Sequence, residues 1–402
     1  MPRRQKDRLF TSSFIYTCIG NFMLFLGFYL LLPVLPLYLI DNFHASKPEV
    51  GIILSCYTIA ALAVRPFSGY LADMFDRKPL YLLSYILFIS VFITYPLVET
   101  LLLFALMRVL HGLTFGMVST SGNTLVVDIM PASRRGEGLG YFGISGNLAM
   151  AIGPMIGIVL HEATGSYNII FYTAIISGLI GFCAACKIHT PKKQKAVREP
   201  LSLDRFFLIK GFKASICLLL MAFPFGITTS YVALYARELG ITSSVGLFFS
   251  LLAAGLIISR TFAGTMVDKG KLLKVITWGS AIGLIAFSLF AFLGLVAPFH
   301  LFFATILFFT VALLIGIGYG MIFPAYNTLF INLAPHNRRA TASSTYLTSW
   351  DLGIGAGLIF GADLAEISGF SLAYFVGSFL ILISIVLFVA IEIPHYNRNK
   401  LC

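Results

Sequence analysis

The stretch RPFSGYLADMFDRK, residues 65–78, has a second copy in the other half of the chain, RTFAGTMVDKGK, residues 260–271. In each copy an arginine, a glycine and an aspartate follow one another at intervals of four residues. They are Arg65, Gly69 and Asp73 in the first copy and Arg260, Gly264 and Asp268 in the second, 195 positions later. A repeat of this kind indicates that the chain contains a duplicated structural unit.

A second set of motifs repeats with a spacing of 204 residues. Glycine-methionine occurs at 116–117 and 320–321, and asparagine-threonine-leucine at 123–125 and 327–329. The same spacing relates Gly153 to Gly357. Internal duplication in an apolar chain is typical of secondary transporters, in which the substrate site lies between two related halves. The repeats therefore predict two similar halves with a site between them.

The composition of the 402 residues predicts an all-α integral membrane protein. Hydrophobic residues make up 58% of the chain and charged residues 11%, and the mean hydropathy is +0.91. A chain this apolar cannot present a water-facing surface, and a segment that spans the bilayer core has to satisfy its own backbone hydrogen bonds as a helix. Windows of about 20 residues predict twelve transmembrane helices. They lie near residues 11–40, 50–72, 79–98, 100–129, 138–161, 168–187, 213–236, 244–267, 272–296, 300–332, 340–365 and 371–394.

Basic residues predict the orientation, because lysine and arginine in short loops stay on the cytoplasmic side. Arg77, Lys78, Arg338 and Arg339 fall in alternate loops on one face, which also receives both tails. We therefore expect a multi-pass protein of the cell membrane with both termini in the cytoplasm. The longest polar stretch predicts a cytoplasmic linker at residues 188–212, between six-helix bundles at 1–187 and 213–402.

Several other functions are disfavoured by the sequence. The net charge of +11 is explained by orientation toward an anionic inner membrane surface, so we expect membrane lipids rather than nucleic acid as partners. Cys183 and Cys186 resemble a redox or metal pair, but no second ligand pair accompanies them. No hydrolase triad, zinc ligand set or phosphate-binding loop appears at an intelligible spacing. We expect no enzymatic activity, no metal and no cofactor.

The sequence GYLADMFDRK, from Gly69 to Lys78, resembles the signature loop between helices 2 and 3 of the major facilitator superfamily, with Asp76 where a glycine is usual. The resemblance covers essentially the whole chain. It implies the major facilitator fold, with twelve transmembrane helices in two pseudo-symmetric six-helix bundles. The loop is a candidate gate, formed by Arg65, Gly69, Asp73, Arg77, Lys78, Arg260, Gly264 and Asp268. For Arg65 and Arg260 a structural role, with the side chain reaching back to the membrane interface, is an open alternative. Charge-assisted hydrogen bonds of these aspartates could exist in one packing of the halves and not in the other.

Arg108 interrupts an apolar predicted helix, LFALMRVLHGLTFG, and the second half has Ala312 in its place. An arginine within the bilayer costs about 2.5–3.5 kcal/mol on insertion scales, so we expect it to face a water-filled cavity or a carboxylate on a substrate or proton path. Arg108, His111 and Gly112 resemble the helix-4 arginine motif of the superfamily, which is associated with proton coupling in exporters. For His111, packing and function remain open alternatives, because a lone histidine is often a hydrogen-bonded packing residue.

Asp351, in SWDLGIGAG, lies well inside its predicted helix and is a second candidate for proton coupling. A carboxylate that alternates between an apolar environment and a nearby cation can load and release a proton. Its equivalent in the first half is Asn147, which cannot titrate. The alternative for Asp351 is a structural role at a break in the glycine-rich helix.

The resemblance also suggests the direction of transport and the residues of a cavity. Gly153, Pro154 and Gly157 resemble the antiporter motif associated with exporters, although tight helix packing also explains them. The family architecture implies a central cavity with polar and aromatic side chains, of which each is also a candidate for simple packing. The candidates are Asn21, Phe25, Tyr29, Asn147, Thr228, Tyr231, Tyr319, Tyr326 and Asn327.

The sequence thus predicts a secondary active transporter, a proton-coupled exporter of small amphipathic molecules that works by alternating access. The resemblance places it with the drug:proton antiporters, and we expect a monomer. The partners expected are a small-molecule substrate and protons. A metabolite or sugar symporter or uniporter, and a lipid flippase, are the alternatives.

Overall fold

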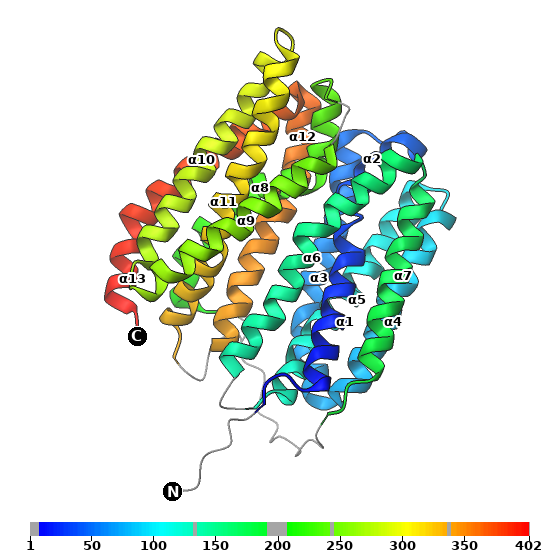
Figure 1. Cartoon of the computed structure of the whole chain (residues 1–402), viewed down its shortest axis with the longest axis vertical. Coiled ribbons are helices and arrows are strands. Elements are labelled where there is room, and N and C mark those ends of the chain that lie inside the picture. The colour runs from blue at the N-terminus through cyan, green and yellow to red at the C-terminus, as the bar shows by residue number, and fades with distance from the viewer. Residues whose placement is uncertain (1–7, 132–134, 191–206, 242–244, 336–338, 402) are drawn as a thin grey trace, which may run out of the picture. The chain divides into compact units, whose positions relative to one another are not determined.

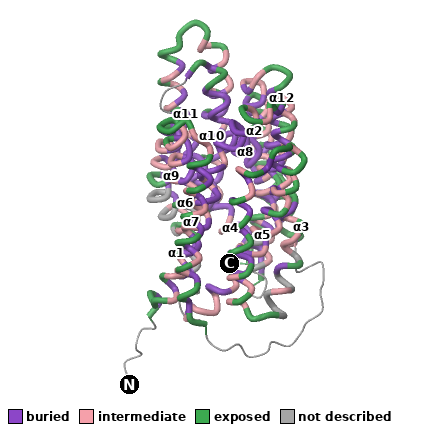
Figure 2. Tube along the Cα trace, turned by 90° about the vertical axis from the view of Figure 1, so that its right-hand side faces the viewer, coloured by how far each residue is buried: buried purple, intermediate pink, exposed green. Residues whose placement is uncertain are grey.

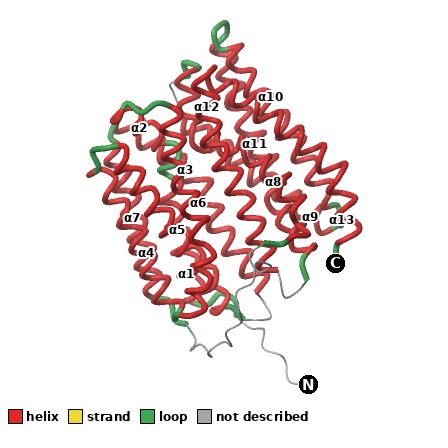
Figure 3. Tube along the Cα trace, turned by 180° about the vertical axis from the view of Figure 1, so that it is seen from behind, coloured by secondary structure: helices red, strands yellow, loops and turns green. Residues whose placement is uncertain are grey.

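A computed structural model of the chain describes residues 8–131, 135–190, 207–241, 245–335 and 339–401. Within these ranges the regular secondary structure is entirely helical, as Figure 3 shows. The chain divides by its internal contacts into two compact units. The first unit comprises Met1–Leu32 and Ile59–Arg198, and the second comprises Pro33–Thr58 and Glu199–Cys402.

The first unit is a bundle in which α1 packs on α6 and α7, and α4 packs on α5 and α7 (Figure 1). Its elements are α1 (Ser12–Tyr29), the second part of α3 (Lys47–Met74), α4 (Arg77–Thr94), the 3-10 turn η1 (Tyr95–Leu97), α5 (Leu101–Ile129), α6 (Arg135–Thr164) and α7 (Tyr167–Cys186). Thr100 caps α5, because its hydroxyl oxygen accepts the backbone N–H of Leu103 at 3.3 Å.

The second unit repeats this arrangement, with α8 on α12, and α11 on α9 and α10. Its elements are α2 (Val34–Phe43), the first part of α3, η4 (Ile209–Gly211), α8 (Phe212–Glu238), α9 (Val245–Asp268), α10 (Leu272–Val296), α11 (Leu301–Leu333), α12 (Arg339–Leu387), the π-helical turn η6 (Phe388–Glu392) and α13 (Ile393–Asn399). Figure 2 shows buried residues gathered around α8, whose side chains from Met221 to Ala236 are all buried.

The helices agree with the predicted number of membrane spans. Ten helical segments of the described residues are long and apolar enough to cross a bilayer. The last of these, Thr345–Asn399, holds two predicted spans, because Ser368 and Gly369 leave helical geometry inside α12. The 24-residue helix α9 supplies the remaining span. The all-α membrane fold with twelve spans is therefore confirmed.

Two details of the chain path differ from the predicted ranges. The stretch predicted as one helix over 11–40 is two helices, because the chain turns between Tyr29 and Val34, where Pro33 precedes α2. Residues 33–58, which the sequence places in the N-terminal bundle, belong with the second unit by their contacts. Most of the predicted linker, residues 191–206, lies outside the described residues, so the boundaries at 187 and 213 stay predictions.

The duplication is visible in how the helices approach one another. A Cβ at Gly116 on α5 would lie 2.8 Å from the carbonyl oxygen of Ala61 on α3. A Cβ at Gly320 on α11 would lie 2.8 Å from the carbonyl oxygen of Leu256 on α9. Both separations are too short for a carbon atom against a rigid backbone. The repeated glycines therefore hold the same close helix contact in each unit.

Candidate functional site

A buried polar cluster lies in the first unit, where η1 meets α5. Arg108 is 2% exposed and His111 is fully buried, and both extend from α5. The Tyr95 hydroxyl of η1 lies 2.6 Å from Nδ1 of His111 and accepts a hydrogen bond from Nη1 of Arg108 at 3.3 Å. Arg108 and His111, which the sequence singled out, are thus brought together by Tyr95, which it did not.

The hydrogen bonds of the cluster depend on the protonation of His111. A guanidinium only donates, so the Tyr95 oxygen accepts from Arg108. In the neutral tautomer with the proton on Nε2, the tyrosine O–H donates to Nδ1 of His111. A proton added at Nδ1 would reverse the bond between Tyr95 and His111. It would also place two positive charges beside one hydroxyl oxygen, and these charges repel each other.

Aromatic rings surround the histidine and bury the cluster. The His111 ring centroid lies 4.4 Å from that of Phe88 and 4.7 Å from that of Phe92, both on α4. Phe104 stacks on Tyr95 with centroids 4.9 Å apart. Such rings supply large apolar contacts with defined geometry, and in a low-dielectric site the hydrogen bonds of the cluster are strengthened.

Asp351 lies in α12 of the second unit and is half-buried. The residue before it, Trp350, packs against Phe323 with ring centroids 4.6 Å apart and against Phe225 at 5.2 Å. Tyr319 joins the same aromatic group. Asp351 therefore emerges beside an aromatic cluster of α8 and α11. Whether it shares a space with Arg108 depends on how the two units are placed, and that part of the prediction stays a prediction.

Three predicted cavity residues lie together on α1 in the first unit. The Asn21 amide donates to the Ser145 hydroxyl at 2.8 Å and so connects α1 to α6. Phe25 stacks on Tyr29 with centroids 5.8 Å apart and meets the edge of Phe115 on α5 at 5.6 Å. Phe25 and Tyr29 are half-exposed. Their rings can therefore face a ligand, whereas Asn21 is used in helix packing. The side chain of Asn147 lies outside the described part of the structure.

The predicted cavity residues of α8 and α11 are more deeply packed. The hydroxyl of Tyr231 donates to the Leu358 carbonyl at 2.9 Å, and that of Tyr319 to the Met221 carbonyl at 2.6 Å. Thr228 bonds its own helix at Pro224. These bonds hold α8 against α11 and α12. Tyr326 is buried beside Asn327, which is half-buried.

The signature loop makes contacts within the first unit. Arg77, at the start of α4, forms an ion pair with Asp128 of α5 and donates to the Thr124 carbonyl at 3.3 Å. Lys78 donates to the carbonyl of Cys186 at 3.0 Å. Arg65 is half-buried on α3. The backbones of the remaining gate candidates lie in α3 and α9, and their side chains lie outside the description; they are Gly69, Asp73, Arg260, Gly264 and Asp268.

The motif of Gly153, Pro154 and Gly157 lies where α6 packs against the end of α1. A Cβ at Gly153 would lie 2.7 Å from Cβ of Tyr29, and one at Gly157 would overlap the carbonyl oxygen of Leu30. Pro154 is inside α6 and withholds one backbone hydrogen bond there. The motif thus gives α1 its close approach, next to the half-exposed ring of Tyr29.

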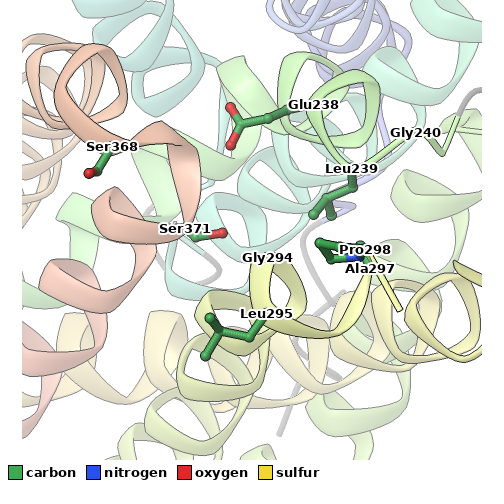
Figure 4. Close-up of a pocket in the computed structure, with 9 residues that line it drawn as sticks. All are labelled: Glu238, Leu239, Gly240, Gly294, Leu295, Ala297, Pro298, Ser368 and Ser371. Atoms are coloured by element: carbon green, nitrogen blue, oxygen red, sulfur yellow. The ribbon is translucent and has the colours of Figure 1, made fainter. Parts of the chain in front are cut away.

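A surface pocket lies at the end of the second unit where α8 and α10 finish (Figure 4). The Glu238 carboxylate in it accepts the backbone N–H of Phe370 at 3.1 Å. Gly369 has a φ of +76°, and a side chain there would meet Glu238. The carboxylate therefore stabilises the turn inside α12, and none of the predicted site residues lines this pocket.

Two site residues were missed by sequence reasoning. Tyr95 is one of 18 tyrosines and falls at the end of a predicted helix, so its pattern carries no distinguishing signal. Asp128 could have been found, because it is an acid inside the span predicted over 100–129. Acids within a span usually have a partner that faces the bundle interior.

Comparison with known proteins assigns the chain to a family. The model of the Major Facilitator Superfamily matches residues 17–358 and 282–400. The quinolone resistance protein NorA of Staphylococcus aureus is 31% identical over 173 residues, which are 43% of this chain and 44% of that protein. An uncharacterized MFS-type transporter of Methanocaldococcus jannaschii, MJ1560, is 24% identical over 385 residues, covering 93% of this chain and 97% of that one.

Solved structures agree on the fold. A POT family transporter in complex with a thioalcohol-conjugated peptide superposes with a TM-score of 0.78 at 16% identity, covering 96% of each chain. At this identity the likeness shows the fold alone. The family match extends over most of the sequence and agrees with the helical, multi-pass architecture. The chain is therefore a transporter rather than an enzyme, and it belongs to the Major Facilitator Superfamily.

Proposed function

We propose that the protein is a proton-coupled exporter of small amphipathic molecules that works by alternating access. The observation that carries the proposal is the buried cluster of Arg108, Tyr95 and His111. A buried cation in a bilayer-embedded bundle is costly, and residues that bear this cost usually serve a substrate or proton path. The second copy of the duplicated unit does without it, having Ala312 and Ile315 at the equivalent places, so the fold itself does not require the cluster.

The cluster suggests how proton binding would change the bundle. A proton on His111 reverses its bond to Tyr95 and repels Arg108, so the guanidinium is driven away from the tyrosine. The two arrangements differ in charge and in hydrogen bonding, which is what a coupled switch needs. Asp351, beside the aromatic cluster of the second unit, is the proposed partner that carries the proton in the other half of the cycle.

Ion pairs at one end of the second unit hold residues 33–58 on α8 and α12. Arg237 donates to Asp41 at 3.1 Å, and the Lys47 ammonium lies 3.8 Å from the Glu238 carboxylate. Lys47 also donates to the Ala365 carbonyl at 3.0 Å. Both partners of each pair belong to the second unit.

The direction and the substrate class rest on likeness and on chemistry. NorA is named for quinolone resistance, and the match to it favours export of amphipathic compounds. The half-exposed rings of Phe25 and Tyr29 are suited to an apolar or aromatic ligand. A small molecule with an aromatic part and one charge is therefore the proposed substrate.

The test is transport into proteoliposomes under an imposed pH gradient, with a panel of amphipathic fluorescent compounds. The proposal expects accumulation that collapses when a protonophore removes the gradient. Arg108→Ala and Asp351→Asn should both lose gradient-driven accumulation. Normal accumulation in both variants would refute their assignment to the proton path, and accumulation that survives the protonophore in the wild type would refute proton coupling.

A further inference from the structure

Glu392 is a fully buried acid at the C-terminal end of the second unit. It ends the π-helical turn η6, directly before α13, and its side chain is 0% exposed. Among the described residues, neither carboxylate oxygen has a hydrogen-bond partner. The predicted span over 371–394 includes this position, but the sequence analysis did not select it. A π-helical turn inside a helix is frequently found at a functional site.

The groups that surround Glu392 and its immediate neighbours come from five elements. Nδ1 of His395, on α13, lies 3.5 Å from Oε2. On α8, the positive charge of Lys213 attracts the carboxylate when it is ionised, and the buried thiol of Cys217 lies near it. From α11, Tyr326 is the neighbour, and its ring packs on Phe388 with centroids 5.8 Å apart. On α12, the Ser384 hydroxyl donates to the Cys217 carbonyl at 2.8 Å. The positive charge of Lys210, on η4, disfavours a positive charge on His395.

The burial of Glu392 is maintained by the docked end of the chain. The Asn332 amide of α11 donates to the Tyr396 hydroxyl at 2.9 Å, and the backbone N–H of Leu401 donates to the Asn332 carbonyl at 2.9 Å. These bonds hold α13 on α11 and keep the carboxyl covered. Lys213 is exposed, so an ammonium group stands at the rim of the buried site.

An ionised carboxylate in this position would be expensive, because burial removes its hydration and no hydrogen bond replaces it. A neutral carboxylic acid avoids most of this cost, because it carries no net charge into the buried site. The geometry therefore fits a bound proton. If the proton leaves, the negative charge has the His395 ring at 3.5 Å and the positive charge of Lys213 at the rim of the site.

We infer that Glu392, together with His395, is a proton-binding site of the second unit, separate from Asp351 and from the cluster around Arg108. The ligand is a single proton, held on the carboxyl while the docked α13 keeps it buried. The site lies directly behind Tyr326, a predicted cavity residue. Its use in coupling rests on the proposed function, but proton binding does not.

The direct test is infrared spectroscopy of the full-length protein in a detergent without ester groups. A buried carboxylic acid gives a carbonyl stretch that shifts when the sample is moved into heavy water. The wild type should show this band near neutral pH, and Glu392→Gln should lose it. The matched control is Glu366→Gln, which removes an exposed acid and should keep the band. Asp351→Asn should keep it as well.

The outcomes separate this inference from the proposed function. Absence of the band in the wild type near neutral pH, or its persistence in Glu392→Gln, would overturn the proton site. If the site also serves coupling, Glu392→Gln should keep downhill exchange of substrate in proteoliposomes and lose gradient-driven accumulation. A wild type that shows the band but no gradient-driven transport would refute the proposed function and leave the proton site standing.

Discussion

The two units share their close helix contacts and differ in their buried polar groups. Gly116 and Gly320 make equivalent approaches, yet Arg108 and His111 of α5 correspond to Ala312 and Ile315 of α11, which are fully buried and apolar. The second unit also has a buried ionisable group that the first unit lacks. At the same spacing of 204, Glu392 corresponds to Ile188, which is fully buried. The comparison teaches that close helix packing is shared by both copies, whereas these buried ionisable groups each occur in one copy only.

The largest expected effect comes from removing the charge that only the first unit has. Arg108→Met should lower the initial rate of gradient-driven transport at least about 100-fold, equivalent to roughly 2.7 kcal/mol. Transport in proteoliposomes measures the effect, and thermal unfolding checks that the variant is folded.

The matched control for that change is Arg398→Met, which removes an exposed arginine of α13. It should transport as the wild type does. Equal loss of transport in both variants would show that Arg108 has no role in transport beyond that of an exposed arginine.

The second prediction tests the contact that both units share. Gly116→Ala and Gly320→Ala should each destabilise the protein by about 1–3 kcal/mol, because the added methyl group meets a backbone carbonyl. Gly143→Ala is the control, because its Cβ would meet no described atom within 4 Å. Thermal unfolding should rank both variants below the control by similar amounts. A large loss at only one glycine would break the equivalence of the two units.

The third prediction concerns the hydroxyl that joins the cluster. Tyr95→Phe removes one oxygen that bonds both Arg108 and His111, and it should cost about 1–2 kcal/mol of stability. Tyr172→Phe on α7 removes an exposed hydroxyl and should cost nothing measurable. Equal unfolding temperatures for the two variants would show that the hydroxyl contributes no more than a surface group.

The smallest effect is expected at the exposed ion pair of the second unit. A double-mutant cycle of Asp41→Asn and Arg237→Gln should give a coupling energy of about 0.2–1 kcal/mol. The coupling should fall as salt is added, because exposed charges are screened. A coupling that exceeds this range and ignores salt would mean that the pair is buried in solution.

Much of the fold was predictable, because hydrophobic burial and helix packing produce recognisable patterns in the sequence. Apolar stretches of membrane length predicted the spans, and the repeated glycines of α5 and α11 predicted equivalent halves. The turn between α1 and α2 was missed, because LLLP, residues 30–33, is as apolar as the helices beside it. Hydropathy does not register a short turn between two apolar helices.

The site was predictable only in part. Arg108 was found because a charge in an apolar helix is conspicuous, whereas Tyr95 depends on a tertiary contact between η1 and α5 that no local pattern encodes. Glu392 was overlooked because it stands near polar residues at the end of a span, in AIEIPHYN, where acids are commonly solvated. Its burial follows from the docking of α13, which only the folded chain reveals.

The anchoring of the final residues on α11 has a practical meaning for experiments. Because the backbone of Leu401 is bonded to Asn332, a fluorophore or spin label placed at residue 401 would move with that helix. Distance measurements from such a label would report rigid-body displacement of the second unit. A bulky purification tag at the same residue would instead disturb α13, which covers the carboxyl of Glu392. Its effect on activity should therefore be checked before any pH dependence is interpreted.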